Sequence, residues 1–224
     1  MENGVRIWDL PIRVFHWCLA ALVVFSYVTG RLGGSWLDWH MRSGYAILAL
    51  LVFRIAWGFI GSDSARFSRF LRSPAAAFTY LRDLAQGTLR PFAGHNPAGG
   101  WMVMAMLAAV LVQAFAGLFA DDEIATQGPL AVKASNAWVA KMTRLHDWNQ
   151  WAVVALVVVH VAAIAIYRWR FHARLTRIMV TGDVPELAPG LSPPRVRSTA
   201  LGAACLAIAA ALVYALVVIY PALR

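Results

Sequence analysis

Five long apolar stretches constrain the fold of this chain more than any other feature of its sequence. A helix needs about 20 mostly apolar residues to cross a hydrocarbon core of about 30 Å. Such stretches predict helices over residues 11–30, 39–59, 97–120, 145–169 and 199–220. None alternates with the period of two that marks a barrel strand, so helices are the only way to satisfy the backbone in lipid. The sequence therefore predicts an all-α integral membrane protein.

The composition agrees with this class, since 60% of the residues are hydrophobic and the mean hydropathy is +0.61. Soluble domains are about 45–50% apolar. A formal charge of +9 could also indicate nucleic-acid binding. However, the arginines lie in short loops between the apolar stretches and not along one soluble face. We therefore expect membrane lipid around the chain, and no nucleic acid.

Loop arginines predict the orientation of the chain in the membrane. Loops 62–96 and 168–197 carry five and six arginines, whereas the opposite side has Arg31, Arg42 and the acidic residues 121–123. The positive-inside rule places the arginine-rich loops and the N-terminus in the cytoplasm. With five helices, the C-terminus then lies in the periplasm, which makes this a multi-pass protein of the bacterial inner membrane.

The sequence also predicts how the helices are grouped. Residues 1–182 form a four-helix transmembrane domain, in which loop 62–96 contains an amphipathic helix over 74–87 that lies on the cytoplasmic interface. Residues 183–198 hold four of the ten prolines and are expected to be a linker. Residues 199–224 are then a separable C-terminal transmembrane helix.

Histidines inside the apolar stretches point to function, because ionisable residues in a membrane span are costly and usually functional. Four of the six histidines lie there: His16, His40, His146 and His160. Three of them are near span ends and could simply lie at the interface, but His160 is surrounded by valine and alanine. Of the remaining two, His95 is expected at the membrane interface and His172 at the basic cytoplasmic edge.

The spacing of two histidines in the fourth stretch predicts two separate sites. His146 and His160 are 14 residues apart, which in a helix is a rise of about 21 Å and a rotation about 40° short of four turns. One helix face therefore carries two imidazoles at two depths. With the N-terminus in the cytoplasm, His40 matches His146 near the outer face, and His16 matches His160 near the cytoplasmic face.

Two imidazoles that face each other across a helix bundle suit the two axial positions of a haem iron. A zinc ion would need three or four protein ligands close together. The sequence therefore favours a four-helix bundle with two bis-histidine haems, plus the fifth helix. A proton-coupled carrier that uses the histidines as relays is the main alternative, and a haem-free anchor is another. No apolar stretch contains a central Asp or Glu, which weighs against the carrier.

Several other residues are candidates for contact with the haems. Gly44, one turn after His40, would let a porphyrin lie against the backbone, although ordinary helix packing explains it equally well. Arg54 lies 14 residues after His40 and could pair with a propionate, or its side chain could extend to the headgroups instead. Further propionate candidates are Arg13, Arg42 and Arg144.

Six segments of the chain resemble the bacterial cytochrome b-561 and nickel–iron hydrogenase b-type cytochrome subunits. They are V-R-I-W-D-L-P-I-R-V-F-H-W at 5–17, W-H-M-R-S-G-Y at 39–45, F-R-I-A-W-G-F-I-G at 53–61, G-H-N-P-A-G-G-W-M at 94–102, R-L-H-D-W-N at 144–149 and I-M-V-T-G at 178–182. The resemblance covers about residues 5–182. Its most specific part is the early H-W together with the histidine pair spaced by 14 residues.

The resemblance implies a four-helix core with two haems b, one held by His16 with His160 and the other by His40 with His146. It also implies electron transfer between a periplasmic redox partner, a c-type cytochrome or a hydrogenase, and membrane quinone. We expect quinone near Arg13, Arg54 and His95. The acidic loop 121–123 could dock a basic partner, or it could simply be a solvated loop. The sequence leaves open a homodimer and a role as an oxidoreductase subunit.

Overall fold

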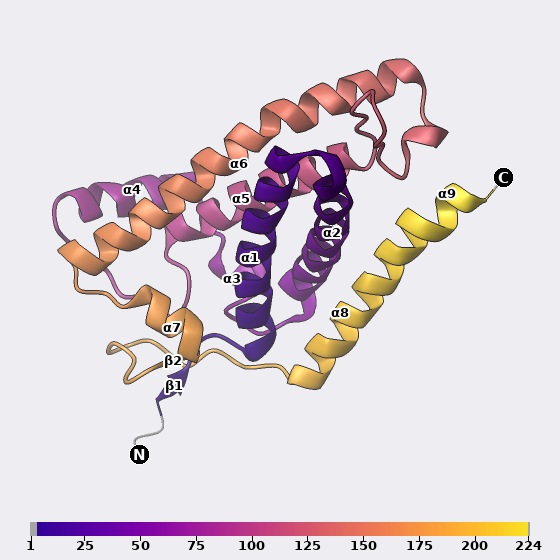
Figure 1. The fold of residues 1–224 in the computed structure, drawn as a ribbon. Helices are drawn as coiled ribbons and strands as arrows, with labels where there is room; N and C mark the ends of the chain where they lie inside the picture. The colour runs from indigo at the N-terminus through magenta and orange to yellow at the C-terminus, as the bar shows by residue number, and fades with distance from the viewer. Residues whose placement is uncertain (1–3, 224) are drawn as a thin grey trace. The chain divides into compact units, whose positions relative to one another are not determined.

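The computed structural model describes residues 4–223 and confirms an α-helical architecture with five helices long and apolar enough to cross a membrane (Figure 1). The long helices are α1 (Leu10–Leu32), α2 (Leu37–Ile60), α5 (Pro97–Gly117), α6 (Asn136–Arg170) and α8 (Thr199–Tyr214). A π-helical turn over Ala215–Ile219 and α9 (Tyr220–Ala222) continue α8. Each long helix corresponds to one of the five predicted stretches.

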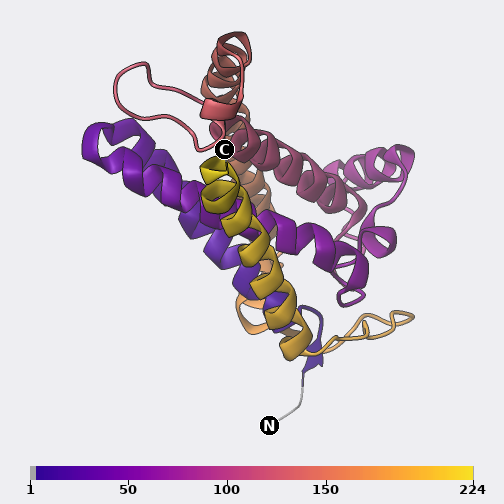
Figure 2. The ribbon, with the colours of Figure 1, turned by 90° about the vertical axis from the view of Figure 1, so that its right-hand side faces the viewer.

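Short elements connect the long helices. They are β1 (Val5–Arg6), η1 (Gly34–Trp36), α3 (Phe67–Phe70), α4 (Pro74–Ala85), η2 (Ala131–Lys133), α7 (Leu175–Thr181) and β2 (Asp183–Val184). The two strands are antiparallel and pair Val5 with Val184. The turn at η1, which joins α1 to α2, is visible in both views (Figures 1 and 2). Helix α4 confirms a helix at the predicted position, and its place on the cytoplasmic interface stays a prediction.

Two features differ from the prediction because hydropathy alone cannot detect them. Helix α6 begins at Asn136, nine residues before the predicted start at 145. Its first turns mix polar and charged residues with apolar ones and precede the predicted stretch. The Ser135 hydroxyl accepts a hydrogen bond from the backbone N–H of Trp138 at 3.3 Å. Helix α7 was expected to be loop, since its seven residues are too few to give a clear periodicity.

The chain forms two compact units. The first contains the described residues up to Val14, Ile55–Met106 and Leu156–Ala203, and the second contains Phe15–Arg54, Leu107–Ala155 and the chain from Ala204 on. The first unit holds the N-terminal ends of α1, α5 and α8 and the C-terminal ends of α2 and α6. This grouping of helix ends is what an up-and-down arrangement of successive helices requires.

A buried carboxylate fixes the start of α1 in the first unit. Asp9 is only 1% exposed, and its Oδ1 accepts the backbone N–H of Ile12 at 2.7 Å, which is a helix N-cap. Its Oδ2 accepts the indole N–H of Trp57 at 3.0 Å, and Trp57 is fully buried. Both carboxylate oxygens therefore satisfy a buried donor, and Asp9 joins the start of α1 to the last turns of α2.

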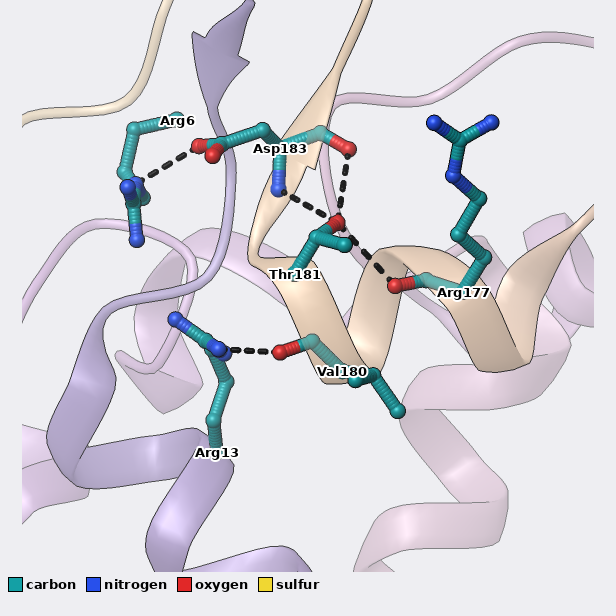
Figure 3. A network of polar contacts seen from close by, with 6 residues as sticks. All are labelled: Arg6, Arg13, Arg177, Val180, Thr181 and Asp183. Carbon is teal, nitrogen blue, oxygen red and sulfur yellow. Dashed lines mark hydrogen bonds and ion pairs between the residues drawn. The ribbon is translucent and has the colours of Figure 1, made fainter.

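The segment before α1 is held by the residues around the end of α7 (Figure 3). Arg6 pairs with Asp183 at 2.6 Å, and the guanidinium of Arg13 donates to the carbonyl of Val180. The carbonyl of Gly182 accepts the backbone N–H groups of Ile7 and Trp8. Gly182 has φ of 87°, and a Cβ there would lie 2.7 Å from the Trp8 carbonyl oxygen, so the position requires glycine.

The end of the predicted linker contacts the turn that follows α2. Backbone groups of Asp63 and Arg195 are hydrogen-bonded at 3.0 Å, and the N–H of Arg197 donates to the hydroxyl of the buried Ser62 at 2.9 Å. Partial desolvation acts to raise the pKa of Asp63, but hydrogen bonds from Arg195 and Arg66 outweigh it and hold that pKa below its usual range. Asp63 therefore stays ionised and keeps this end of the linker in place.

Helix α8 packs closely on the other helices in each unit. In the first unit, a Cβ on Gly202 would lie 2.4 Å from Cγ of Pro11 and 3.6 Å from Cη2 of Trp57. In the second unit, a buried apolar cluster contains Leu48, Leu118, Leu130 and Val213. Helix α8 thus packs closely against the start of α1, and this contact requires glycine at position 202.

Replacement of Asp9 by alanine is expected to destabilise the protein by about 2–4 kcal/mol, since it removes a helix cap and the carboxylate oxygen that accepts the buried Trp57 N–H. Asp9→Asn retains one carbonyl oxygen and is expected to cost less. Thermal unfolding in detergent, followed by circular dichroism, measures both. Asp38→Ala, in the exposed first turn of α2, is the control and should cost about 0.3–1 kcal/mol. Equal losses for Asp9→Ala and Asp38→Ala would contradict this account.

Candidate functional site

Two of the four span histidines face each other in the second unit. The ring centres of His40, on α2, and His146, on α6, are 5.8 Å apart, and their planes are perpendicular at 90°. A metal bound by one nitrogen of each ring, with bonds of about 2 Å, would hold the ring centres about 6 Å apart. Two perpendicular imidazole planes can both contain the axis of those bonds. The pair therefore has the separation that two axial haem ligands need.

Hydrogen bonds determine which nitrogen of each ring is available. Nδ1 of His40 lies 2.8 Å from the carbonyl oxygen of Ser26, and Nδ1 of His146 lies 3.0 Å from that of Gln113. A carbonyl can only accept, so each Nδ1 must carry the proton. The lone pair of each neutral ring is then on Nε2, the nitrogen left for a metal. Metal-ligating histidines are typically held in this way by an acceptor on their other nitrogen.

Two glycines allow the rings to lie against neighbouring helices. A Cβ on Gly30 of α1 would lie 2.8 Å from Nδ1 of His40, and a Cβ on Gly117 of α5 would lie 2.9 Å from Cε1 of His146. Any larger residue at either position would displace a ring. Neither glycine was predicted from the sequence, because nothing there distinguishes them from small residues used for ordinary helix packing.

Two amide side chains fasten α5 to α6 beside the histidine. Gln113 donates through Nε2 to the carbonyl of His146 at 2.9 Å, and Asn149 donates to Oε1 of Gln113 at 2.8 Å and to the carbonyl of Ala109 at 2.9 Å. Together with the hydrogen bond of His146 Nδ1, these contacts hold α6 against α5. Neither amide was predicted from the sequence, although Asn149 ends the segment R-L-H-D-W-N.

Open space borders α2 one turn after His40. A Cβ on Gly44 would have no atom within 4 Å apart from the backbone of its own helix, whereas a Cβ on Gly30 or Gly117 would meet a histidine ring. Because Gly44 has no side chain, a flat macrocycle could lie in this space against the helix backbone. The histidine pair, its available nitrogens and this space together fit a haem.

The arginines proposed to meet propionates have different environments. Arg54, in the second unit, is 2% exposed, and a buried guanidinium in a membrane span is costly unless it is paired. Arg42 and Arg144 are exposed in the same unit, and the Arg42 guanidinium lies 5.4 Å from the centre of the Trp39 ring. Arg13 is in the first unit, where it donates to Val180 (Figure 3). Their contact with a cofactor stays a prediction.

The other histidines have distinct surroundings. His16 is half-buried in the second unit and lies 4.9 Å from the ring of Trp17, whereas His160 is half-buried in the first unit. Their pairing stays a prediction. In the first unit, His95 packs between the rings of Trp8 at 4.7 Å and Phe70 at 4.6 Å. His172 is exposed, as expected for the basic edge.

A second polar cluster, also missed from the sequence, joins α4, α5 and α6 in the first unit. The hydroxyls of Tyr80 and Tyr167 are 2.6 Å apart, and Asn96 donates to Tyr167 at 3.0 Å while its Oδ1 caps α5 through the N–H of Gly99. Burial, and then the contact with Tyr167, raise the pKa of Tyr80 far above its usual value. Tyr80 therefore remains a neutral phenol, and its hydrogen bond to Tyr167 connects α4 to α6.

Known proteins provide an independent comparison. The sequence model of a family described as prokaryotic cytochrome b561 matches residues 7–182. A protein of Azotobacter chroococcum mcd 1 is 22% identical over 194 residues, which covers 71% of this chain and 80% of the relative. One of Azotobacter vinelandii is 23% identical over 124 residues, which covers 44% of this chain and 51% of the relative. Both are named probable Ni/Fe-hydrogenase B-type cytochrome subunits, and no solved structure matches the chain.

The family match confirms the resemblance seen in the sequence motifs and extends over most of the chain. It implies b-type haem and electron transfer across a membrane, in agreement with the five apolar helices and the facing histidines of the second unit. The chain belongs to the prokaryotic cytochrome b561 family and is a multi-pass membrane cytochrome b.

Proposed function

We propose that this protein carries electrons across the bacterial inner membrane through two haems b, one near each face. His40 and His146 would hold the outer haem, and His16 and His160 the cytoplasmic one. The observation that carries the proposal is the His40–His146 pair, whose ring centres are 5.8 Å apart and whose Nδ1 atoms are both directed at backbone carbonyls.

At the outer site the haem would supply a reversible one-electron couple, and the chain would set its position and surroundings. The carbonyls of Ser26 and Gln113 hold His40 and His146 in the tautomer that ligates and make the rings more basic. Because both axial positions would be occupied by histidine, neither oxygen nor an organic substrate could reach the iron. The site therefore suits electron transfer and not bond-making catalysis.

The second haem is supported by helix geometry. Helix α6 runs without interruption from Asn136 to Arg170, so the rise of about 21 Å from His146 to His160 applies along one helix. His160 would then lie close to the opposite membrane face. The propionate candidates at that depth are Arg54, buried in the second unit, and Arg13, which donates to Val180.

The partners follow from the proposed orientation, with the N-terminus in the cytoplasm and the C-terminus in the periplasm. Quinone would exchange electrons near the cytoplasmic haem, among Arg13, Arg54 and His95. The outer haem would serve a hydrogenase or a c-type cytochrome, and the first of these agrees with the names of the two relatives. A homodimer is compatible with the same scheme.

The acidic loop between α5 and α6 would supply a negative surface for that outer partner. Three backbone N–H groups, those of Thr126, Ile124 and Ala125, donate to the Asp122 carboxylate and lower its pKa below the usual value. The charge therefore persists in mildly acidic conditions. It would favour a docking partner with a basic surface.

The purified protein is expected to contain two haems b per chain. A pyridine haemochrome assay on a sample of known protein concentration measures this ratio. One haem per chain would contradict the pairing of four histidines, and none would leave a histidine proton relay or a haem-free anchor.

Single histidine substitutions should remove the haems selectively. His146→Ala is expected to lower the haem content from two to one by loss of the outer haem, and His160→Ala to lower it to one by loss of the cytoplasmic haem. Redox titration of the haem absorbance should show a different single component in each variant. His172→Ala, outside both pairs, is the control and should keep both components. Loss of the same component in both variants would contradict the assignment.

Gly44→Ala separates cofactor contact from protein packing. The added Cβ meets no neighbouring side chain, and alanine in a helix is favoured over glycine by about 0.5–1 kcal/mol. The haem-free protein should therefore be as stable as the parent or more so. If a porphyrin lies against this backbone, haem occupancy at the outer site should fall, and haemochrome content together with thermal unfolding measures both effects. Full occupancy in Gly44→Ala would exclude close porphyrin contact at this position.

A further inference from the structure

Three arginines that the proposed electron transfer does not use line a pocket at the end of α6 in the first unit. Arg168, Arg174 and Arg177 surround a cavity of about 530 Å³, and the apolar side chains of Ile164 and Leu175 line it as well. No acidic residue is among its lining residues. The pocket thus combines a cluster of positive charges with an apolar wall.

The charges of this pocket are not balanced by the protein residues that the structure describes. No ion pair of Arg168, Arg174 or Arg177 occurs among residues 4–223. The first acidic residue after α6, Asp183, is paired with Arg6 at 2.6 Å. Figure 3 shows the Arg177 guanidinium directed away from that network, while its carbonyl accepts the Thr181 hydroxyl at 3.0 Å. Three like charges around one cavity repel each other, and an anion would relieve that repulsion.

The pocket lies where a membrane lipid can reach it. Helix α6 is one of the five candidate spans and ends at Arg170. Trp169, next to the pocket residue Arg168, is 78% exposed, as is typical of a tryptophan at the membrane–water interface. Ile164 is about one turn deeper in the span, so an occupant would meet apolar surface on the membrane side and arginines on the water side.

We propose that this pocket binds an anionic phospholipid. The phosphate would accept hydrogen bonds from Arg168, Arg174 and Arg177, because a guanidinium matches phosphate oxygens with paired donors. The beginning of an acyl chain would lie along Ile164 and Leu175. A lipid with net negative charge, such as phosphatidylglycerol, is preferred over phosphatidylcholine, whose choline would add a fourth positive charge. This site is independent of the haems and of their redox partners.

Lipid titration of the full-length, haem-loaded protein in detergent tests the proposal. Delipidated protein is titrated with phosphatidylglycerol or phosphatidylcholine, and native mass spectrometry counts the bound lipids. The double variant Arg174→Gln, Arg177→Gln is expected to bind phosphatidylglycerol about 25-fold more weakly, about fivefold for each arginine removed. The double variant Arg174→Lys, Arg177→Lys keeps the charge but loses the paired donors. Its affinity for phosphatidylglycerol should lie between those of the parent and the glutamine variant.

The control removes two other exposed arginines of the first unit. Arg72→Gln, Arg82→Gln changes the net charge equally and should leave the affinity for phosphatidylglycerol unchanged, and the haem absorbance of each variant reports correct folding. An equal loss in the control would show a general charge effect and overturn the site. Equal binding of phosphatidylcholine, binding of inorganic phosphate as tight as that of the lipid, or no retained lipid would each overturn it as well.

Discussion

Two hydrogen bonds from imidazole N–H groups to backbone carbonyls define the chemistry available in the second unit. They hold His40 against Ser26 of α1 and His146 against Gln113 of α5. Each bond satisfies a polar group that would be costly to leave unpaired within a membrane span, and each leaves one basic nitrogen for a metal. The rings are therefore oriented by the polypeptide itself. Gly30 and Gly117 allow the close approach on which this orientation depends.

The sequence predicted the parts of the fold that hydrophobicity controls. The five apolar stretches correspond to five long helices, and the amphipathic pattern of 74–87 corresponds to α4. The start of α6 at Asn136 was missed because a helix can continue beyond the hydrocarbon core, where polar residues such as Lys141 and Arg144 interrupt the apolar pattern. Helix α7 and the short β1–β2 ladder were missed because their stability comes from contacts between residues far apart in the sequence.

The candidate site could be predicted from the sequence to a similar extent. Helical spacing and depth were sufficient to propose that His40 and His146 approach each other, and the structure brings their rings together. The ligand role of these histidines, and that of His16 and His160, stays a prediction. The carbonyl acceptors could not be identified in advance, since every residue has one. The roles of Gly30 and Gly117 become apparent only when the helix that each one contacts is known.

The contacts of Asp9 with Trp57 and of Ser26 with His40 have a consequence for biosynthesis. Both connect α1 to α2, so the first helical hairpin contains all the groups needed to form them. The N-terminal part of a chain is made first and can fold before the rest. The hairpin can therefore close inside the membrane while α5 and α6 are still untranslated. His40 would then already be oriented by the time the ribosome reaches His146. Assembly of the site would only require α5 and α6 to pack against the hairpin of α1 and α2.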